Sequence, residues 1–330
     1  MSIDLSAHPE KPPRRLFWFA FVASVYTLFH IKFGAMVVST GSGMAFPDWP
    51  LANGSWWPAD MTAPQYFEHL HRFFGALTGL FTIGLLFGIR KMSRAVPQRS
   101  WLVKAAWILL ILVIVQGVLG GLGVLLGEKD GLTYAPAAIA HGVLGQSTLC
   151  LMVAMTFGLS LGYDERLSVT ASNASGARKA SIVALSAVFL QLIVGAIYRH
   201  TDVRGALWVH ISMAMVVSIL ILVATAFVVG RFNEVPRGLS RLAKTIHGLL
   251  IVQLLLGFST LAVRNFKNPS NIEEIGSSLV ASLHVVVGAL LFLCAALLCV
   301  RAYRTLEPAQ ATEPDVDTLS NEPVAGGRTA

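Results

Sequence analysis

Residues 71–90 read HRFFGALTGLFTIGLLFGIR: a histidine, a glycine four residues later, and an almost uninterrupted apolar run. The same arrangement, with Gly or Ala four residues after the histidine, recurs at His141, His210 and His284. Successive histidines are 70, 69 and 74 residues apart. Residues four positions apart lie on one face of a helix. The pattern therefore predicts four apolar helices that each present an imidazole and a small residue on the same face.

The composition is that of an integral membrane protein. Of the 330 residues, 55% are hydrophobic and 13% are charged, whereas soluble domains carry about 25% charged residues. A helix needs about 20 apolar residues to span the hydrocarbon core of a bilayer. Eight such stretches are predicted, at residues 16–38, 70–90, 101–127, 136–163, 179–199, 204–230, 241–264 and 277–301.

Lysine and arginine are unevenly distributed between the two sets of loops. One set, with both termini, holds 17 of them, and six lie at or near the other set. Since cytoplasmic loops carry the excess of basic residues, both termini are predicted to be cytoplasmic. The net charge of +7 follows from this orientation signal, so a lipid bilayer is the expected partner and a nucleic acid is not.

The chain contains an internal repeat. Gln116/Gly120, Gln191/Gly195 and Gln253/Gly257 share the spacing Gln-x-x-x-Gly on alternate predicted helices, and His30/Gly34 stands at the equivalent place in the first. We therefore predict an all-α integral membrane protein whose eight transmembrane helices form two tandem four-helix bundles related by pseudo-two-fold symmetry. The predicted divisions are a cytoplasmic tail (1–15), an N-terminal bundle (16–163), a cytoplasmic linker (164–178), a C-terminal bundle (179–304) and a disordered cytoplasmic tail (305–330).

The four repeated histidines are candidate haem ligands. Helix starts expected at Pro64, Pro136, Thr201-Asp202 and Ser277-Ser278 place the histidines 5–9 residues inside their helices, at similar depth. Histidine inside a membrane is costly without a partner, and neutral imidazole is a common axial ligand of haem iron. The small residue one turn further on would leave room for a porphyrin. The alternative for any single histidine is a hydrogen bond between helices, but four matched positions favour two haems, ligated by His71 with His141 and by His210 with His284.

The two predicted bundles differ in one respect. Glu68 and Arg72 lie on the same helical face as His71, whereas Leu207 stands three residues before His210. Glu68 is either part of an interfacial ion pair or a carboxylate beside a reactive haem, held by Arg72. The asymmetry indicates that one bundle is reactive and the other holds a fixed cofactor.

Several further residues are candidates for a supporting role. The Gly-rich loop of residues 39–50 carries Asp48 and Trp49, and it either belongs to the interfacial aromatic belt or folds over the reactive site as a lid. Arg199 and Arg264, near the outer ends of their helices, either reach toward the interface or pair with haem propionates. The cysteines Cys150, Cys294 and Cys299 all lie within predicted spans, so no loop disulfide is expected.

Residues 40–43 (TGSG), 47–50 (PDWP) and 68–72 (E-x-x-H-R) together resemble the haem A synthase family, and the resemblance extends over the eight helices, residues 16–301. It implies tandem four-helix bundles that oxidise the C8 methyl of haem O to a formyl group, giving haem A for terminal oxidases. It also implies that His71 and His141 face the substrate haem, that His210 and His284 hold a permanent haem b and its iron, and that Glu68 is the essential carboxylate. The chain departs from the bacterial pattern because its first outer loop has Phe46 and Ala52 and no cysteine pair.

Two functional hypotheses are kept. The first is a haem-dependent oxidoreductase of a bacterial cytoplasmic (inner) membrane, with an unidentified electron donor and with haem O synthase and a terminal oxidase as candidate partners. The second is a non-catalytic b-type cytochrome with bis-histidine ligation, or a haem-delivery factor, for which the asymmetry of Glu68 has no purpose. A homo-oligomer is compatible with both hypotheses.

Overall fold

The computed structural model describes residues 12–127, 131–160, 169–171, 173–201, 203–232, 238–263 and 271–308. Over these residues the protein is all-α, as predicted, and eight of its helices are long and apolar enough to cross a membrane. They are α1 (Arg14–Ser39), α2 (Ala63–Ser93), α3 (Trp101–Gly127), α4 (Gly131–Gly158), α5 (Ala174–Thr201), α6 (Arg204–Phe232), α7 (Leu239–Val263) and α8 (Asn271–Thr305).

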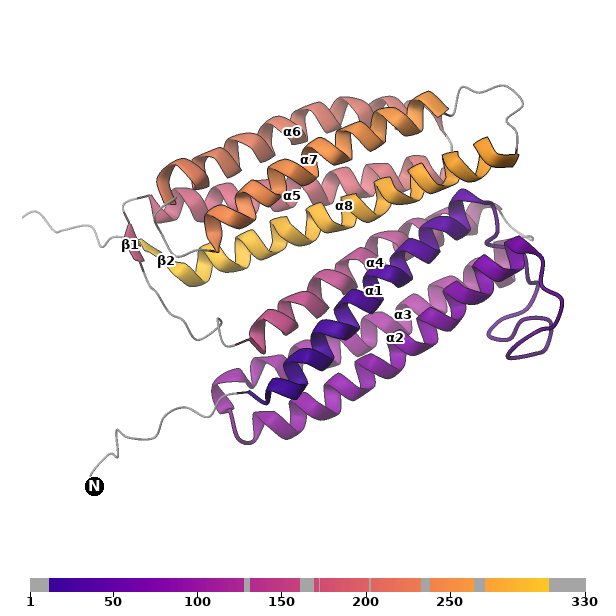
Figure 1. The fold of residues 1–330 in the computed structure, drawn as a ribbon, viewed down its shortest axis with the longest axis horizontal. Coiled ribbons are helices and arrows are strands. Elements are labelled where there is room, and N and C mark those ends of the chain that lie inside the picture. Colours follow the sequence, from indigo (N-terminus) through magenta and orange to yellow (C-terminus); the bar gives the residue numbers. More distant parts are fainter. Residues whose placement is uncertain are drawn as a thin grey trace, which may run out of the picture.

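The helices form two four-helix bundles that lie side by side (Figure 1). In the first, each of α1–α4 packs on the next and α4 closes the ring on α1; α5–α8 repeat this arrangement. The bundles meet through α1 and α4 on one side and α5 and α8 on the other, with α1 against α8 and α4 against α5. These reciprocal contacts are those expected of a pseudo-two-fold relation between the bundles.

The helix starts differ from the prediction where proline or serine was the only guide. Pro64 does mark the start of α2, where Thr62 and Gln65 form a capping box. By contrast α4 begins at Gly131 with Pro136 inside it, and α8 begins at Asn271. A proline in the first turn of a helix sacrifices no hydrogen bond, whereas Pro136 lies beyond the first turn and removes the bond to the carbonyl of Leu132. A proline therefore marks a helix start only approximately.

The ends of the C-terminal bundle are tied together outside the membrane-spanning segments. Strand β1 (Val169–Ala171), within the predicted linker, pairs in parallel with strand β2 (Leu306–Pro308), within the stretch predicted to be disordered. Arg178, on the first turn of α5, donates a hydrogen bond to the carbonyl of Leu306. The helical part of this bundle accordingly begins at Ala174 rather than residue 179, and the rest of the predicted tail lies outside the described residues.

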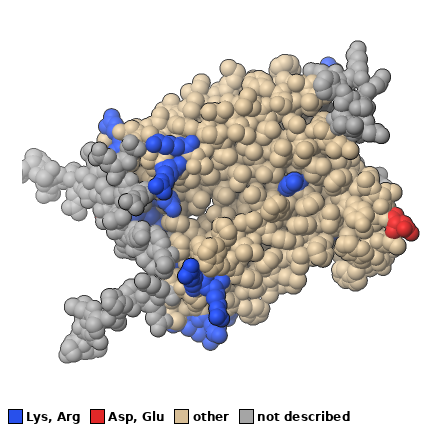
Figure 2. Space-filling model, viewed as in Figure 1, with Lys and Arg blue, Asp and Glu red and all other residues tan. Residues whose placement is uncertain are grey.

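Basic side chains gather at the end of the molecule that carries β1, β2 and the connection from α2 to α3 (Figures 1 and 2). That connection includes the 3-10 turn η1 (Pro97–Arg99). Arg99 is 2% exposed and donates hydrogen bonds to the carbonyls of Gly158 and Ser160 at the end of α4. A cation at a helix C-terminus is favourable, so this arginine contributes to packing as well as to the charge asymmetry.

The fully buried apolar core of each bundle lies in the half nearer the basic end. In the first bundle it comprises residues from 20–23, 85–109 and 152–159, and in the second from 174–188, 217–250 and 291–306. The four repeated histidines lie toward the opposite end, beyond both clusters. Each bundle therefore combines a tightly packed half with a half in which polar side chains occupy the centre.

Candidate functional site

In each bundle two histidines from alternate helices face one another. The rings of His71 on α2 and His141 on α4 have centroids 6.1 Å apart at an interplanar angle of 82°. The rings of His210 on α6 and His284 on α8 have centroids 6.3 Å apart at 78°. These are the histidines that were paired from the sequence, and the two pairs have nearly the same geometry. The two pairs are therefore the candidate sites of the molecule.

Each histidine is positioned by the helix that precedes it. A Cβ added to Gly34, Gly120, Gly195 or Gly257 would lie 2.7, 3.6, 2.9 or 3.2 Å from Cε1 of the histidine on the next helix. At Gly34 and Gly195 the imidazole thus rests against backbone that only glycine leaves open, whereas a Cβ at Gly257 would be tight and one at Gly120 would make an ordinary contact. The Gln/His-x-x-x-Gly motif on the odd-numbered helices is therefore the cradle of the histidine that follows.

The residue four positions before each cradle glycine also reaches the histidine. The Gln191 amide nitrogen lies 3.1 Å from Nδ1 of His210 and donates to the His210 carbonyl at 2.9 Å. The amide nitrogen of Gln253 lies 3.2 Å from Nε2 of His284. On α3 the backbone carbonyl of Gln116 lies 3.1 Å from Nδ1 of His141. Such partners fix the orientation of an imidazole and its tautomer.

The small residue four positions after a histidine also makes a contact that was not predicted. Gly75, Gly145 and Gly288 face the side chain at the motif position of the neighbouring helix: His30, Gln116 and Gln253, respectively. These small residues therefore let the helices of a hairpin approach closely, and their role toward a porphyrin stays a prediction. In these three hairpins the histidine of the second helix packs on a glycine of the first, and the Gln or His of the first helix packs on a glycine of the second.

The donor set of each pair fits a metal held between two imidazoles. Two metal–nitrogen bonds of about 2 Å, with a ring beyond each, place the ring centres about 6 Å apart, close to both observed separations. Nδ1 of His71 and Nδ1 of His284 are buried without a hydrogen-bond partner. No group of three or more His, Cys, Asp or Glu among the described residues could hold a metal ion. Each site thus offers two axial ligands, which is what a haem iron requires of a protein.

Glu68 and Arg72 join α2 to the outer loop that precedes it. Glu68 is 3% exposed; one carboxylate oxygen pairs with Arg72 and the other accepts a hydrogen bond from the backbone N–H of Phe46 at 3.1 Å. Arg72 also donates to the carbonyls of Asp48 and Leu51, at 2.7 and 2.5 Å. The predicted ion pair is present, and it fixes the loop against the end of α2 one turn from His71.

The loop itself is ordered by Asp48 and Trp49. The Asp48 carboxylate accepts hydrogen bonds from the backbone N–H groups of Asn53 and Gly54, at 2.8 and 2.7 Å, both of which have positive φ. Slight burial raises the pKa of Asp48, but these bonds and the charge of Arg72 outweigh it and leave the pKa below its ordinary value. The indole of Trp49 packs over Gly121 on α3, so it anchors the loop across the bundle as well as lying near the interface.

Of the two predicted arginines, the structure describes Arg199, which lies between the two bundles. Arg199 donates hydrogen bonds to the carbonyl of Ala35 and the hydroxyl of Ser39, each at 2.8 Å, and thereby links α5 to the end of α1. Ser278 and Ser282 on α8 also donate to Ser39, at 3.0 and 3.1 Å. This polar junction between the bundles was not predicted, because isolated serines in apolar helices carry no distinctive spacing. Arg264 lies outside the described residues.

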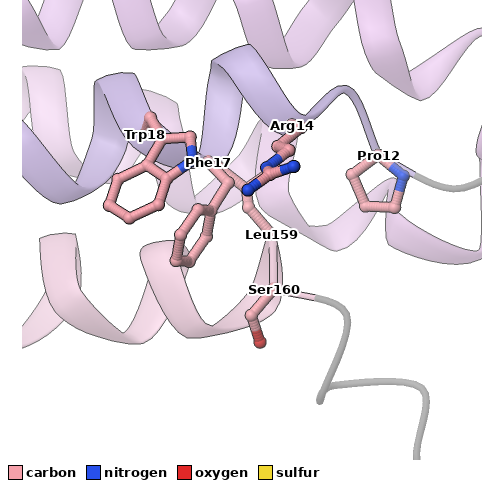
Figure 3. Close-up of a pocket in the computed structure, with 6 residues that line it drawn as sticks. All are labelled: Pro12, Arg14, Phe17, Trp18, Leu159 and Ser160. Atoms are coloured by element: carbon pink, nitrogen blue, oxygen red, sulfur yellow. The ribbon is translucent and has the colours of Figure 1, made fainter.

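A surface cavity of about 460 Å³ lies at the other end of the first bundle (Figure 3). Phe17 and Trp18 on α1 line it together with Leu159 and Ser160 after α4. Phe17 and His30 are 13 residues apart on one helix, which corresponds to about 20 Å. The cavity is therefore separate from the histidine pairs.

The fold and the site define a multi-pass membrane protein built from two four-helix bundles, each with one pair of facing histidines. Comparison with known proteins shows a similarity over part of the chain. The model of the COX15-CtaA family, described as a cytochrome oxidase assembly protein, matches residues 60–207. The matched range includes Glu68, His71 and His141 but ends before His210.

Among the similar proteins are three that are called heme A synthase. The one from Geobacillus kaustophilus is 27% identical over 191 residues, 57% of this chain and 57% of the relative. The one from Symbiobacterium thermophilum is 32% identical over 181 residues, 52% and 55% of the two chains. The one from Rhizobium johnstonii is 32% identical over 131 residues, 35% and 34%. The chain thus matches little more than half the length of these relatives at most.

Proposed function

We propose that this protein is a haem A synthase, which oxidises the C8 methyl of haem O to a formyl group. The observation that carries the proposal is the pair of facing histidines in each bundle, at nearly the same separation, with a carboxylate and an ordered loop beside the first pair. Similarity to heme A synthases supports the reaction class. Haem iron, when bound, supplies the oxidation chemistry, which no protein side chain performs on an unactivated methyl group.

In the N-terminal bundle, His71 and His141 would hold the substrate haem. Glu68 and Arg72 hold the loop of residues 39–62 over this end of the bundle, where it limits access of water. Glu68 also places its carboxylate, paired with Arg72, one turn from His71. Removal of Glu68 is therefore expected to affect conversion more than haem binding.

In the C-terminal bundle, His210 and His284 bind a permanent haem b. Gln191 and Gln253 fix these two imidazoles through their amide groups, and Leu207 takes the place that Glu68 has in the other bundle. A haem b held by these residues would supply electron transfer from an external donor. Both termini are proposed to be cytoplasmic, since the described ends of the chain, at Pro12 and Pro308, lie at the basic end of the molecule (Figures 1 and 2).

The test is chromatography of haems extracted from cells that make this protein together with a source of haem O. We expect haem A in these cells and only haem O in cells that make Glu68→Ala at the same level. Unchanged haem O with the wild-type chain, when the purified protein holds haem b and an electron donor is present, would reject the synthase in favour of a b-type cytochrome.

A further inference from the structure

Arg199 is a partly buried cation on α5, and the proposed function does not use it. It lies one turn beyond the cradle glycine Gly195 and two turns beyond Gln191, so the three residues follow one face of the helix. At the equivalent position the other three helices that carry the motif have an aliphatic residue: Val38, Val124 and Leu261. The positive charge is therefore an addition to the repeat that only α5 carries.

The cation lies close to the pseudo-two-fold axis between the bundles. Nη2 of Arg199 donates to the carbonyl of Ala35 and to the hydroxyl of Ser39, both on α1. Helices α1 and α5 are equivalent in the two bundles, because Gly34 aligns with Gly195. Equivalent segments related by a two-fold axis meet only where both are near that axis. Arg199 is therefore placed between the two histidine pairs.

The same contacts join the cation to the helix that carries His284. Ser282 on α8, two residues before His284, donates a hydrogen bond to the Ser39 hydroxyl at 3.1 Å, and this hydroxyl also accepts from Arg199 at 2.8 Å. Ser278, one turn earlier on α8, donates to the Ser39 carbonyl at 3.0 Å. The charge of Arg199 also acts on the imidazole of His284. Arg199 is thus held within electrostatic reach of one of the two C-terminal histidines.

Arg199 has no acidic partner among the side chains that the structure describes. Both of its described hydrogen bonds go to neutral oxygen atoms. In the other bundle Arg72 also lies beside a ligand histidine, His71, but there Glu68 compensates the charge. The field of a charge is weakly screened where the dielectric constant is low. The C-terminal histidine pair is therefore close to a net positive charge, whereas the N-terminal pair is close to a neutral ion pair.

A nearby positive charge favours the reduced form of a haem, because ferric haem carries one more positive charge than ferrous haem. We propose that the charge of Arg199 raises the reduction potential of the haem held by His210 and His284, and so favours its reduction by the external donor. The inference rests on the proposed function, in which the C-terminal bundle holds a permanent haem b. It assigns the redox setting of that haem to one side chain outside the repeat.

The test is potentiometric titration of the purified full-length protein, followed by the absorbance of reduced haem b. The signal that disappears in His210→Ala belongs to the C-terminal bundle. Arg199→Gln removes the charge and keeps a hydrogen-bond donor. The midpoint potential of this signal should then fall by the equivalent of a tenfold change in the ratio of reduced to oxidised haem, about 59 mV for one electron.

Two variants separate charge from packing. Arg199→Lys keeps the charge without the planar guanidinium, so its potential should stay near that of the wild type. Ser39→Asp leaves Arg199 in place and gives it a carboxylate partner, so the potential should fall as in Arg199→Gln, whereas the neutral Ser39→Asn should not lower it. Arg204→Gln removes an exposed cation at the start of α6 and is the matched control, with little change expected.

Equal potentials in the wild type, Arg199→Gln and Ser39→Asp, with all three chains folded and haem-loaded, would overturn the proposal. A fall of the same size in Arg199→Lys and Arg199→Gln would also overturn it, because packing rather than charge would then be the cause. Haem O conversion by the wild type, measured in parallel, tests the proposed function separately, because the titration involves no turnover.

Discussion

The two bundles share one scaffold and differ in what surrounds their histidines. Ring separations of 6.1 and 6.3 Å and four glycine cradles are common to both. Among the described residues, the first bundle has a carboxylate–arginine pair, an outer loop bound to it and a third imidazole, His30, in contact with the histidine pair. The second has glutamine amides at the corresponding places. The same four-helix arrangement can therefore hold two similar ligands for different functions. The function depends on the side chains around each histidine pair, which are not part of the repeat.

The largest expected effect is loss of haem from the C-terminal bundle alone. His210→Ala removes one of two axial ligands, so the purified variant should lose the permanent haem entirely and keep the site of His71 and His141. Haem content per chain, measured as the pyridine haemochrome, checks this. His200→Ala, a histidine near the end of the neighbouring helix α5, is the control and should keep full content. Full haem in His210→Ala would mean that the two pairs are not separate sites.

The second largest effect is expected on thermal stability, and it concerns the loop of residues 39–62 over the N-terminal bundle. Arg72→Leu leaves the buried Glu68 without its partner and frees the carbonyls of Asp48 and Leu51. Breaking a buried ion pair costs about 3–5 kcal/mol, so the melting temperature in detergent should fall by several degrees. Arg204→Leu, at the exposed start of α6 in the other bundle, should change it little. Equal shifts in the two variants would show that the pair does not stabilise the loop.

Much of this arrangement could be predicted from the sequence because it depends on spacing. Apolar length predicted the eight helices, and the interval between histidines predicted which of them face each other. The Gln-x-x-x-Gly repeat was recognised, but its role was not, since a contact between two helices depends on their relative rotation. For the same reason the contact of His30 with Gly75 was not predicted. The junction at Ser39 and the pairing of β1 with β2 join segments far apart in the chain, and no local pattern indicates either.

A smaller effect, on haem affinity, should distinguish the tight glycine cradle at Gly195 from the looser one at Gly120. Gly195→Ala places a Cβ 2.9 Å from Cε1 of His210, whereas in Gly120→Ala the Cβ would lie 3.6 Å from Cε1 of His141. Overpacking typically costs 1–3 kcal/mol, so Gly195→Ala should weaken haem binding about tenfold. Gly120→Ala should have little effect, and so should Gly117→Ala, whose Cβ meets nothing within 4 Å. Titration of the haem-depleted proteins with haem measures all three, and equal affinities would contradict the cradle.

The smallest effect is expected at Asp48, which orders the turn at Asn53 and Gly54 in the loop over the first bundle. Its pKa is lowered in the folded protein, so its contribution is complete at neutral pH and is lost as the pH falls through the folded pKa. Amide hydrogen exchange at residues 48–57 should therefore quicken in acid beyond its intrinsic pH dependence. Asp48→Asn should exchange faster at neutral pH and show no such acid transition, while helices of the C-terminal bundle serve as the internal control. A wild-type loop with no acid transition would show that the carboxylate does not hold the turn.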